Sequence, residues 1–355
     1  MKKIKLIVSD FHLGKGRLLP DGSMNPLEDF FYDDKFIEFL KHYTSGEYEN
    51  AEFELIINGD FFNLLQTEYV EGADVITEKK AVKIMDDILN GHPQVFDALS
   101  FIATRLNSTL TFVVGNHDQG LLWPGVEAVL RKRISSNIRI FPKNYYFDGV
   151  YVEHGNQYEV LHHFDEKHFA IRSALTEEPI QNLPWGSYFV INFLNRYKLE
   201  RPYIDKIKPF RLYLRWAVIY DTKFAVRALP SMLWFYLIHR FHPDPARRRS
   251  FKVTWHNITE SIAHNNIQNE AFRILKNNKY NTVIFGHTHI YAHKNIDGKE
   301  YLNTGTWNDL ISLDISNFGR YSKLTYVFVD YSDSIPRCYL KVWRGYYRPE
   351  DDLVF

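Results

Sequence analysis

Five short polar motifs in this sequence carry side chains that can bind metal ions, and each motif follows a short apolar run. Asp10 and His12 stand on alternate residues, so both can point to one side of the chain and reach one metal. Asp60 follows a glycine, and its two carboxylate oxygens can bridge two cations. Imidazole nitrogens suit Mn, Fe, Zn, Co and Ni better than Mg or Ca. The candidate metal ligands are Asp10, His12, Asp60, Asn116, His154, His287 and His289.

The apolar runs that precede these motifs are predicted to be buried strands. Helical patterns lie between them, at Asp34–His42 and at Ala81–Leu106, where Pro93 interrupts the pattern. Strands that alternate with helices indicate an α/β architecture. In such sheets the ligand crevice lies beyond the carboxyl ends of the strands, so motifs far apart in sequence can converge on one site. The predicted strands are residues 4–8, 53–57, 110–114, 150–152 and 282–285.

The pattern changes after Gly286 and again in the middle of the chain. A hairpin is predicted from Ile290–Ile296 and Glu300–Thr304 around a turn at Asp297-Gly298. Leu324–Val329 and Cys338–Trp343 are predicted to complete a second sheet. The middle region lacks the strand-motif pattern and shows long aromatic and Arg-rich helical patterns, broken by prolines. We predict residues 1–160 as the first part of a core, 161–263 as an inserted helical cap and 264–355 as the second part of the core.

The five motifs occur in the order Asp-x-His, Gly-Asp, Gly-Asn-His-Asp, His and Gly-His-Thr-His, which resembles the calcineurin-like metallophosphoesterase superfamily. The match covers strand ends in residues 1–160 and 280–310. It implies a four-layer α/β/β/α sandwich, two divalent metal ions and a water or hydroxide between them. By this resemblance Asp60 bridges the metals, with Asp10, His12 and His289 completing the first site and Asn116, His154 and His287 completing the second.

The resemblance also fits the chemistry of the residues themselves. Two cations roughly 3.5 to 4 Å apart lower the pKa of a bridging water and neutralise charge on phosphate oxygens, which makes hydrolysis of a phosphoester the predicted reaction. His117 would donate a proton or a hydrogen bond to the substrate, and Asp118 would orient the His117 ring through its other nitrogen. Mn is the first choice of metal, with Fe, Zn, Co and Ni as alternatives. Asn63 stands where many relatives carry an acid.

Composition limits the other possibilities. The chain has 355 residues, 45% of them apolar, 24% charged and no net charge, which is typical of a globular protein and argues against a general nucleic-acid binder. Cys338 is the single cysteine and cannot form an internal disulfide. The longest apolar stretch, Met232–Ile238, is far shorter than the roughly 20 residues needed to cross a bilayer. No signal-peptide pattern follows Met1, so we expect a cytoplasmic protein.

The predicted insert is basic and aromatic. From Arg196 to Trp255 there are 14 Lys and Arg residues against four acidic residues. The plainest interpretation is an amphipathic subdomain that packs its aromatic residues on the core, with solvated arginines. A protein-docking surface and a nucleic-acid surface stay open, since arginines with interleaved aromatics can track phosphates and stack on bases. His162, His163 and His168 are interpreted as surface or insert residues on a predicted helix.

A fourth interpretation is a lipid-facing insert, with peripheral contact to a membrane. The layout resembles the UDP-2,3-diacylglucosamine pyrophosphohydrolases, which also insert a helical cap between the fourth and fifth motifs but commonly carry Arg at the position of His117. A nucleotide-linked lipid pyrophosphate is therefore one candidate substrate, and a nuclease or other phosphodiesterase is the alternative. Some members of the superfamily have lost metal function and serve as interaction scaffolds, whereas this chain keeps every predicted ligand. The residues suited to lipid contact are Trp234, Phe235, Tyr236, Phe241 and Phe251, beside Arg240, Arg247, Arg248, Arg249 and Lys252.

Overall fold

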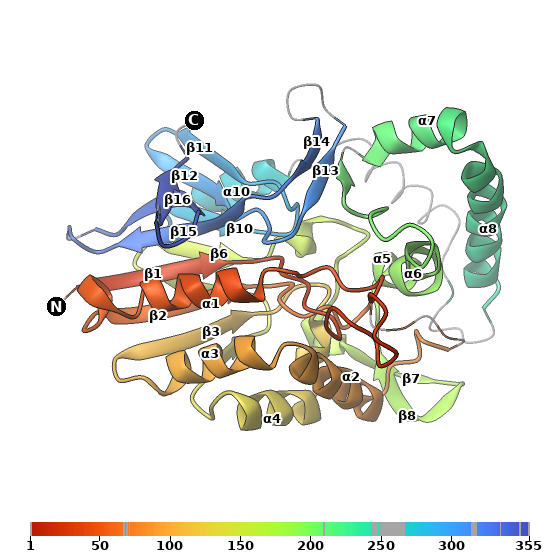
Figure 1. Cartoon of the computed structure of the whole chain (residues 1–355), viewed down its shortest axis with the longest axis horizontal. Helices are drawn as coiled ribbons and strands as arrows, with labels where there is room; N and C mark the ends of the chain where they lie inside the picture. Colours follow the sequence, from red (N-terminus) through yellow and green to blue (C-terminus); the bar gives the residue numbers. More distant parts are fainter. Residues whose placement is uncertain are drawn as a thin grey trace.

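Two β-sheets pack face to face, and helices cover their outer faces (Figure 1). The structure is a computed structural model that describes residues 2–66, 68, 70, 72–208, 210–242, 248, 267–313, 318–333, 335–347 and 349–353. Apolar clusters fill the space between helices and the first sheet, between the two sheets, and between the second sheet and another helix. The predicted four-layer α/β/β/α sandwich is therefore confirmed.

The first sheet has seven strands among the described residues, in the order β17-β16-β15-β1-β2-β3-β4. The strands β1 to β4 run parallel, while β15, β16 and β17 are antiparallel to their neighbours. Their bounds are β1 Lys3–Val8, β2 Glu52–Asn58, β3 Ser108–Val113, β4 Arg139–Phe141, β15 Leu324–Asp330, β16 Arg337–Trp343 and β17 Glu350–Asp352.

The second sheet has five strands in the described part of the chain, in the order β11-β12-β10-β6-β5. Strands β6, β10 and β12 are parallel, and β11 forms the predicted hairpin with β12. The bounds are β5 Asn144–Phe147, β6 Val150–Glu153, β10 Thr282–Phe285, β11 Ala292–Ile296 and β12 Lys299–Asn303.

The prediction that Leu324–Val329 and Cys338–Trp343 complete the second sheet is wrong, because β15 pairs with β1 in the first sheet. Six of the seven residues of β15 are buried, which suits an inner strand flanked on both sides and covered on both faces. Each sheet therefore contains strands from both halves of the chain.

Alternation along β1 shows how the layers are held together. Ile4, Leu6 and Val8 face the helices, whereas Ile7 packs in the cluster between the two sheets, as expected for side chains that alternate across a strand. Each of these side chains is fully buried. Burial of one such aliphatic side chain contributes about 1.5–3 kcal/mol, so β1 is fixed from both faces and positions the motif that follows it.

Helices cover the outer faces of both sheets. Buried residues of α1 (Asp33–His42), α2 (Glu78–Gly91), α3 (Pro93–Thr104) and α4 (Pro124–Arg133) belong to the cluster on the first sheet, and α10 (Ile267–Leu275) packs on the second. The predicted interruption at Pro93 is confirmed, since α2 ends at Gly91 and Pro93 begins α3. Proline suits the first turn of a helix because its missing N–H would have no partner there.

The middle of the chain lies beside the carboxyl ends of the core strands (Figure 1). It contains the hairpin β7 (Ala170–Ser173) and β8 (Thr176–Gln181), then α5 (Trp185–Phe189), a π-helical turn (Val190–Leu194) and α6 (Asn195–Lys198). Strand β9 (Ile207–Lys208) and helices α7 (Phe210–Tyr220) and α8 (Thr222–Arg240) follow. The predicted insert is thus not purely helical. Its predicted end at residue 263, together with Arg247, Arg249, Phe251 and Lys252, lies outside the described residues.

The region predicted as an insert, referred to below as the insert, is joined to the core by a strand. β9 pairs in parallel with β13 (Leu310–Ser312), which also pairs with β14 (Gly319–Tyr321). A small apolar cluster within the insert includes Phe193, Tyr197 and Phe224. No described helix is long and apolar enough to span a bilayer.

Candidate metal centre

The predicted metal ligands follow the carboxyl ends of β1, β2, β3, β6 and β10, and hydrogen bonds continue between the loops beyond the strands. The N–H of Asp10 donates to the Gly59 carbonyl at 3.1 Å, and the N–H of His12 donates to the Asp60 carbonyl at 2.9 Å. The N–H of Gly286 donates to the His154 carbonyl at 3.0 Å. These bonds place the motifs side by side and fix the directions of their side chains.

Most of the predicted ligands have a left-handed backbone, which non-glycine residues rarely adopt. The φ angles are 57° at Asp10, 52° at His12, 50° at Asp60, 69° at His287 and 62° at His289. Each such residue costs about 1–3 kcal/mol and persists only where the surroundings determine its conformation. Concentration of this strain in one set of residues is a mark of a functional site.

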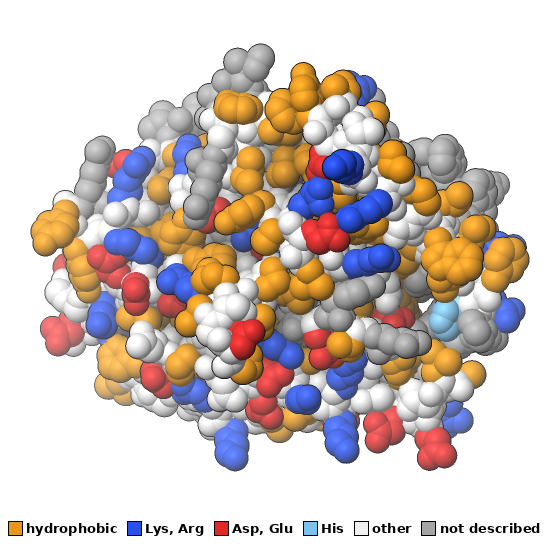
Figure 2. Space-filling view, turned by 45° about the vertical axis from the view of Figure 1, so that its right-hand side comes forward, with side chains coloured by type: hydrophobic (Ala, Val, Ile, Leu, Met, Phe, Trp, Pro, Cys, Tyr) orange, Lys and Arg blue, Asp and Glu red, His pale blue; other side chains and the backbone are white. Residues whose placement is uncertain are grey.

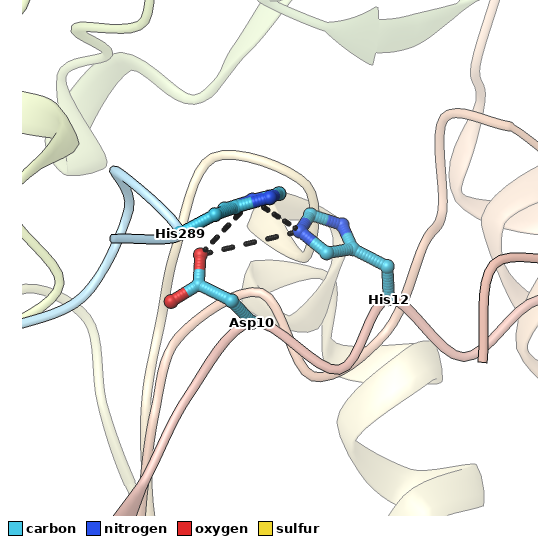
Figure 3. Close-up of side chains that lie close together, drawn as sticks. All are labelled: Asp10, His12 and His289. Carbon is cyan, nitrogen blue, oxygen red and sulfur yellow. Dashed lines mark hydrogen bonds and ion pairs between the residues drawn. The ribbon is translucent and has the colours of Figure 1, made fainter. Parts of the chain in front are cut away.

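Asp10, His12 and His289 form one cluster, in which the side chains converge (Figure 3). His289 Nε2 lies 3.0 Å from His12 Nε2 and 3.4 Å from Asp10 Oδ1. The other Asp10 oxygen accepts a hydrogen bond from the His287 N–H at 3.0 Å. Oδ1 is therefore the oxygen that remains for a cation.

Asp60 lies between this cluster and a second one formed with His154 and His287. Its Oδ1 accepts a hydrogen bond from the His117 N–H at 2.8 Å. Its Oδ2 lies 3.2 Å from His154 Nε2 and 3.9 Å from His12 Nε2. One carboxylate thus faces imidazoles of both clusters, which is the geometry that a bridging ligand needs.

Several atoms at this centre can coordinate a metal ion and have no hydrogen-bond partner within the described part of the chain. Among the described residues, neither Asp10 Oδ1 nor Asn116 Oδ1 has a hydrogen-bond partner, although both atoms are buried. His154 Nδ1 donates to the Asn58 carbonyl at 2.8 Å, which leaves Nε2 as the ligand atom. Two carboxylates, one amide and four imidazoles fit a pair of divalent transition-metal ions.

The electrostatics of the centre also favour cations. Burial raises the pKa of Asp10 to about 6, and nearby Asp60 adds to this rise although His154 opposes it. Two buried carboxylates so close together destabilise each other unless positive charge lies between them. Bound divalent ions would supply that charge.

Glycines before the ligands allow the loops to approach so closely. A Cβ at Gly59 would collide with the His154 ring, and a Cβ at Gly115 would collide with the Asp60 carboxylate. Gly59 also has a φ of 80°, which favours glycine. Both residues are required by the close packing of the ligands.

Comparison with protein families identifies the type of site. The family model for the calcineurin-like phosphoesterases matches residues 6–291, which is most of the chain. The chain belongs to the calcineurin-like phosphoesterase family. This family uses divalent metals, in agreement with the Asp and His clusters described above.

Known proteins add little beyond this membership in the calcineurin-like phosphoesterase family. A search of curated proteins found no match. A dimetal phosphatase from Danio rerio is 9% identical, with 98% of each chain covered and a TM-score of 0.35. A predicted phosphoesterase from Streptococcus pneumoniae is 10% identical, with 99% of this chain and 98% of that chain covered and a TM-score of 0.31. A Vps29 mutant from Entamoeba histolytica is also 10% identical, with 99% of each chain covered and a TM-score of 0.31. Likeness at this level carries no argument about substrate.

His117 lies beside the candidate metal ligands, with its ring centroid 4.5 Å from that of His12. Its Nδ1 lies 3.0 Å from Asn63 Oδ1. The Asn63 amide nitrogen donates to Gln66 Oε1 at 2.6 Å, so the Asn63 oxygen accepts from Nδ1–H of His117. This arrangement leaves Nε2 of His117 for a group in the cavity.

The structure does not support the prediction that Asp118 orients the His117 ring. The Asp118 carboxylate accepts hydrogen bonds from the backbone N–H groups of Gly115 at 2.5 Å and Phe61 at 3.1 Å. It therefore holds the loops that carry Asn116 and Asp60. Asn63 is the residue that contacts the His117 ring.

Sequence reasoning missed Glu159 and His162, which form a further cluster with His287. Glu159 Oε2 lies 2.6 Å from His287 Nε2 and 3.5 Å from His162 Nε2. The helix predicted here is wrong, because His162 lies in a turn and His168 ends a short 3-10 helix. His168 is exposed as expected, but His162 lines the cavity. The signal for Glu159 and His162 was their closeness in sequence to the His154 motif.

A cavity of about 370 Å³ opens over the candidate metal ligands. The core contributes His12, Asp60, Asn116, His117, His287 and His289 to its wall. The insert contributes Val190, Leu194, Asp205, Lys206 and Lys208. A molecule that reaches the ligands therefore also contacts the insert.

Proposed function

We propose that this chain is a two-metal phosphoester hydrolase, with Asp60 as the bridging ligand. The observation that carries the proposal is the position of Asp60 Oδ2, 3.2 Å from His154 Nε2 in one cluster and 3.9 Å from His12 Nε2 in the other. The ligand sets are Asp10, His12, Asp60 and His289 for one ion, and Asp60, Asn116, His154 and His287 for the other. Mn is the proposed metal, because imidazole and carboxylate ligands suit it and family members use divalent ions.

When bound, the two ions would supply a bridging hydroxide as nucleophile and neutralise charge on the phosphate. The chain's own contribution is then His117, whose Nε2 is left for the substrate. Burial lowers the pKa of His117 to about 3, although Asp60 opposes this shift. An anionic phosphate beside the ring favours the protonated form, so substrate entry helps His117 to donate a proton or hydrogen bond to the phosphate or its leaving group.

For the substrate we propose a nucleotide-linked lipid pyrophosphate, hydrolysed at a membrane surface on the cytoplasmic side. Apolar side chains on α7 and α8 support this choice, because they are exposed although most similar residues are buried. The exposed fractions are 68% for Ile219, 60% for Leu233 and 64% for Trp234, and 71% for Phe241, which directly follows α8. Figure 2 turns this side of the molecule toward the viewer and has hydrophobic side chains beside Lys and Arg. Such a mixture suits contact with anionic headgroups.

Only part of the aromatic set of the insert is available for such contact. Phe235 is 7% exposed and packs against the rings of Trp185, Phe189 and Phe193. These contacts agree with the plainer interpretation of the insert, in which aromatic residues stabilise it. The lipid interpretation thus concerns the outer face of α7 and α8.

The reaction is tested with the purified chain, manganese and bis(p-nitrophenyl) phosphate as a generic diester, with UDP-2,3-diacylglucosamine as the second substrate. We expect hydrolysis that is abolished by a chelator and by Asp60→Ala. Cleavage of the generic diester alone would reject the lipid substrate and make single-stranded nucleic acid the next substrate to test. No hydrolysis of any phosphoester, with no metal bound, would favour an interaction scaffold.

Membrane contact has a separate test. Binding to vesicles with an anionic lipid should fall in a variant with Ile219, Leu233 and Trp234 changed to Ser. If the native chain does not bind these vesicles, membrane contact is rejected and the hydrolase assignment is unaffected.

A further inference from the structure

Lys208 brings a positive charge from the insert into the wall of the cavity. It lies on β9, whose pairing with β13 sets it opposite Ser312. The Lys208 carbonyl accepts a hydrogen bond from the Leu313 N–H at 2.9 Å, and the Lys206 carbonyl accepts one from the Ile311 N–H at 2.9 Å. The backbone of Lys208 is thus held on a strand that belongs jointly to insert and core.

The neighbouring lysines are occupied by carboxylates. Lys198 Nζ lies 2.8 Å from Asp29 Oδ1 and 2.7 Å from Asp205 Oδ2. Lys206 Nζ lies 3.1 Å from Asp29 Oδ1. These contacts make both lysines part of the joint between insert and core.

Lys208 differs from them in this respect. Within the described residues, no carboxylate lies within 4.0 Å of its ammonium group, and the group has no hydrogen bond to another side chain. Lys208 is also partly buried, and burial lowers its pKa, opposed by the charges of Asp205, Glu159 and Asp10. A partly buried ammonium group without a partner, in the wall of a cavity over metal ligands, is a site for an anion.

We propose that Lys208 binds a non-bridging oxygen of the phosphate group that the candidate metal centre acts on. This inference rests on the proposed function. The strand holds Lys208 before substrate arrives, so little backbone ordering is required on binding. The ligand class is an organic phosphate, and inorganic phosphate is the simplest probe of the same contact. Lys208 is thus a substrate-binding residue that the insert adds to the core.

The test compares Lys208→Met and Lys208→Gln with the wild-type chain loaded with manganese. Lys132→Met is the matched control, because Lys132 is exposed on α4. Three quantities are measured: bound manganese, kcat and KM for a phosphoester, and the dissociation constant of inorganic phosphate by calorimetry. The phosphate measurement does not depend on turnover.

Loss of a charge-assisted hydrogen bond predicts a rise of about 10- to 100-fold in both KM and the phosphate dissociation constant. Manganese content should stay as in the wild-type chain, and Lys132→Met should change nothing. Values within twofold of wild type in a folded Lys208 variant, or a fall in manganese content, would overturn the inference. A wild-type chain that hydrolyses no phosphoester would reject the proposed function instead, and phosphate binding would still decide the role of Lys208.

Discussion

The contact of Lys198 with Asp29 and Asp205 predicts a measurable coupling between insert and core. Lys198 lies on α6 and its side chain is fully buried, whereas Asp29 belongs to the core. Burial lowers the pKa of Lys198, but Asp205 and Asp29 outweigh burial and raise it. Lys198→Met removes the charge and keeps a side chain of similar length.

The magnitude follows from what remains after the substitution. Breaking a buried ion pair by removing one partner costs about 3–5 kcal/mol. Lys206 still lies 3.1 Å from Asp29, and Gln66 Nε2 still lies 3.2 Å from Asp205 Oδ2, so we expect the lower end. With an unfolding entropy of about 2.1 cal/mol/K per residue, a loss of about 3 kcal/mol lowers the Tm of a 355-residue cooperative unit by about 4 °C.

Thermal unfolding by calorimetry measures this loss, and a second substitution identifies its cause. Asp205→Asn removes the carboxylate that is left without its ion-pair partner when Lys198 is replaced. The double variant Lys198→Met/Asp205→Asn should recover about 1 kcal/mol or more relative to the sum of the single changes. Strictly additive losses, or a Tm within 1 °C of wild type for Lys198→Met, would refute this account of the contact.

Two further predictions concern the orientation of the His117 ring and the pH dependence of the unfolding free energy. Asn63→Leu removes the acceptor for the His117 ring, so kcat should fall about tenfold while bound metal is unchanged; an unchanged kcat would exclude this positioning role. Burial lowers the pKa of His92, but Asp33 and Glu28 outweigh burial and raise it from 6.5 to about 9. Charged His92 therefore stabilises the fold below pH 6.5, and this stability is lost as the pH rises through about 9. The unfolding free energy of the wild-type chain should therefore fall between pH 6 and pH 10, and this fall should be absent in His92→Gln. A fall that persists in the variant would contradict the assignment.

The strand-end motifs were predictable because their signal is local. A short apolar run followed by Asp10, by Asp60 or by His154 indicates both a buried strand and a polar group at its carboxyl end. The topology of α/β sheets then brings these ends together. The same reasoning predicted the core helices and the hairpin after His289.

The remaining features depend on contacts that are distant in sequence. Asp118 adjoins His117, which suggested a contact, but its carboxylate accepts backbone hydrogen bonds from Phe61 on another loop. The pairing of Lys208 with Ser312 links residues about a hundred positions apart. Nothing in the pattern of β15 distinguishes a strand of the first sheet from one of the second. Tertiary packing decided each of these cases.

The central claim is that two metal ions bind here with Asp60 between them. A crystal grown with manganese, measured for anomalous scattering, tests it directly. We expect two anomalous peaks roughly 3.5–4 Å apart, one beside His12 and His289 and one beside His154 and His287, each within bonding distance of Asp60. A single peak, or two peaks without Asp60 between them, would contradict the account.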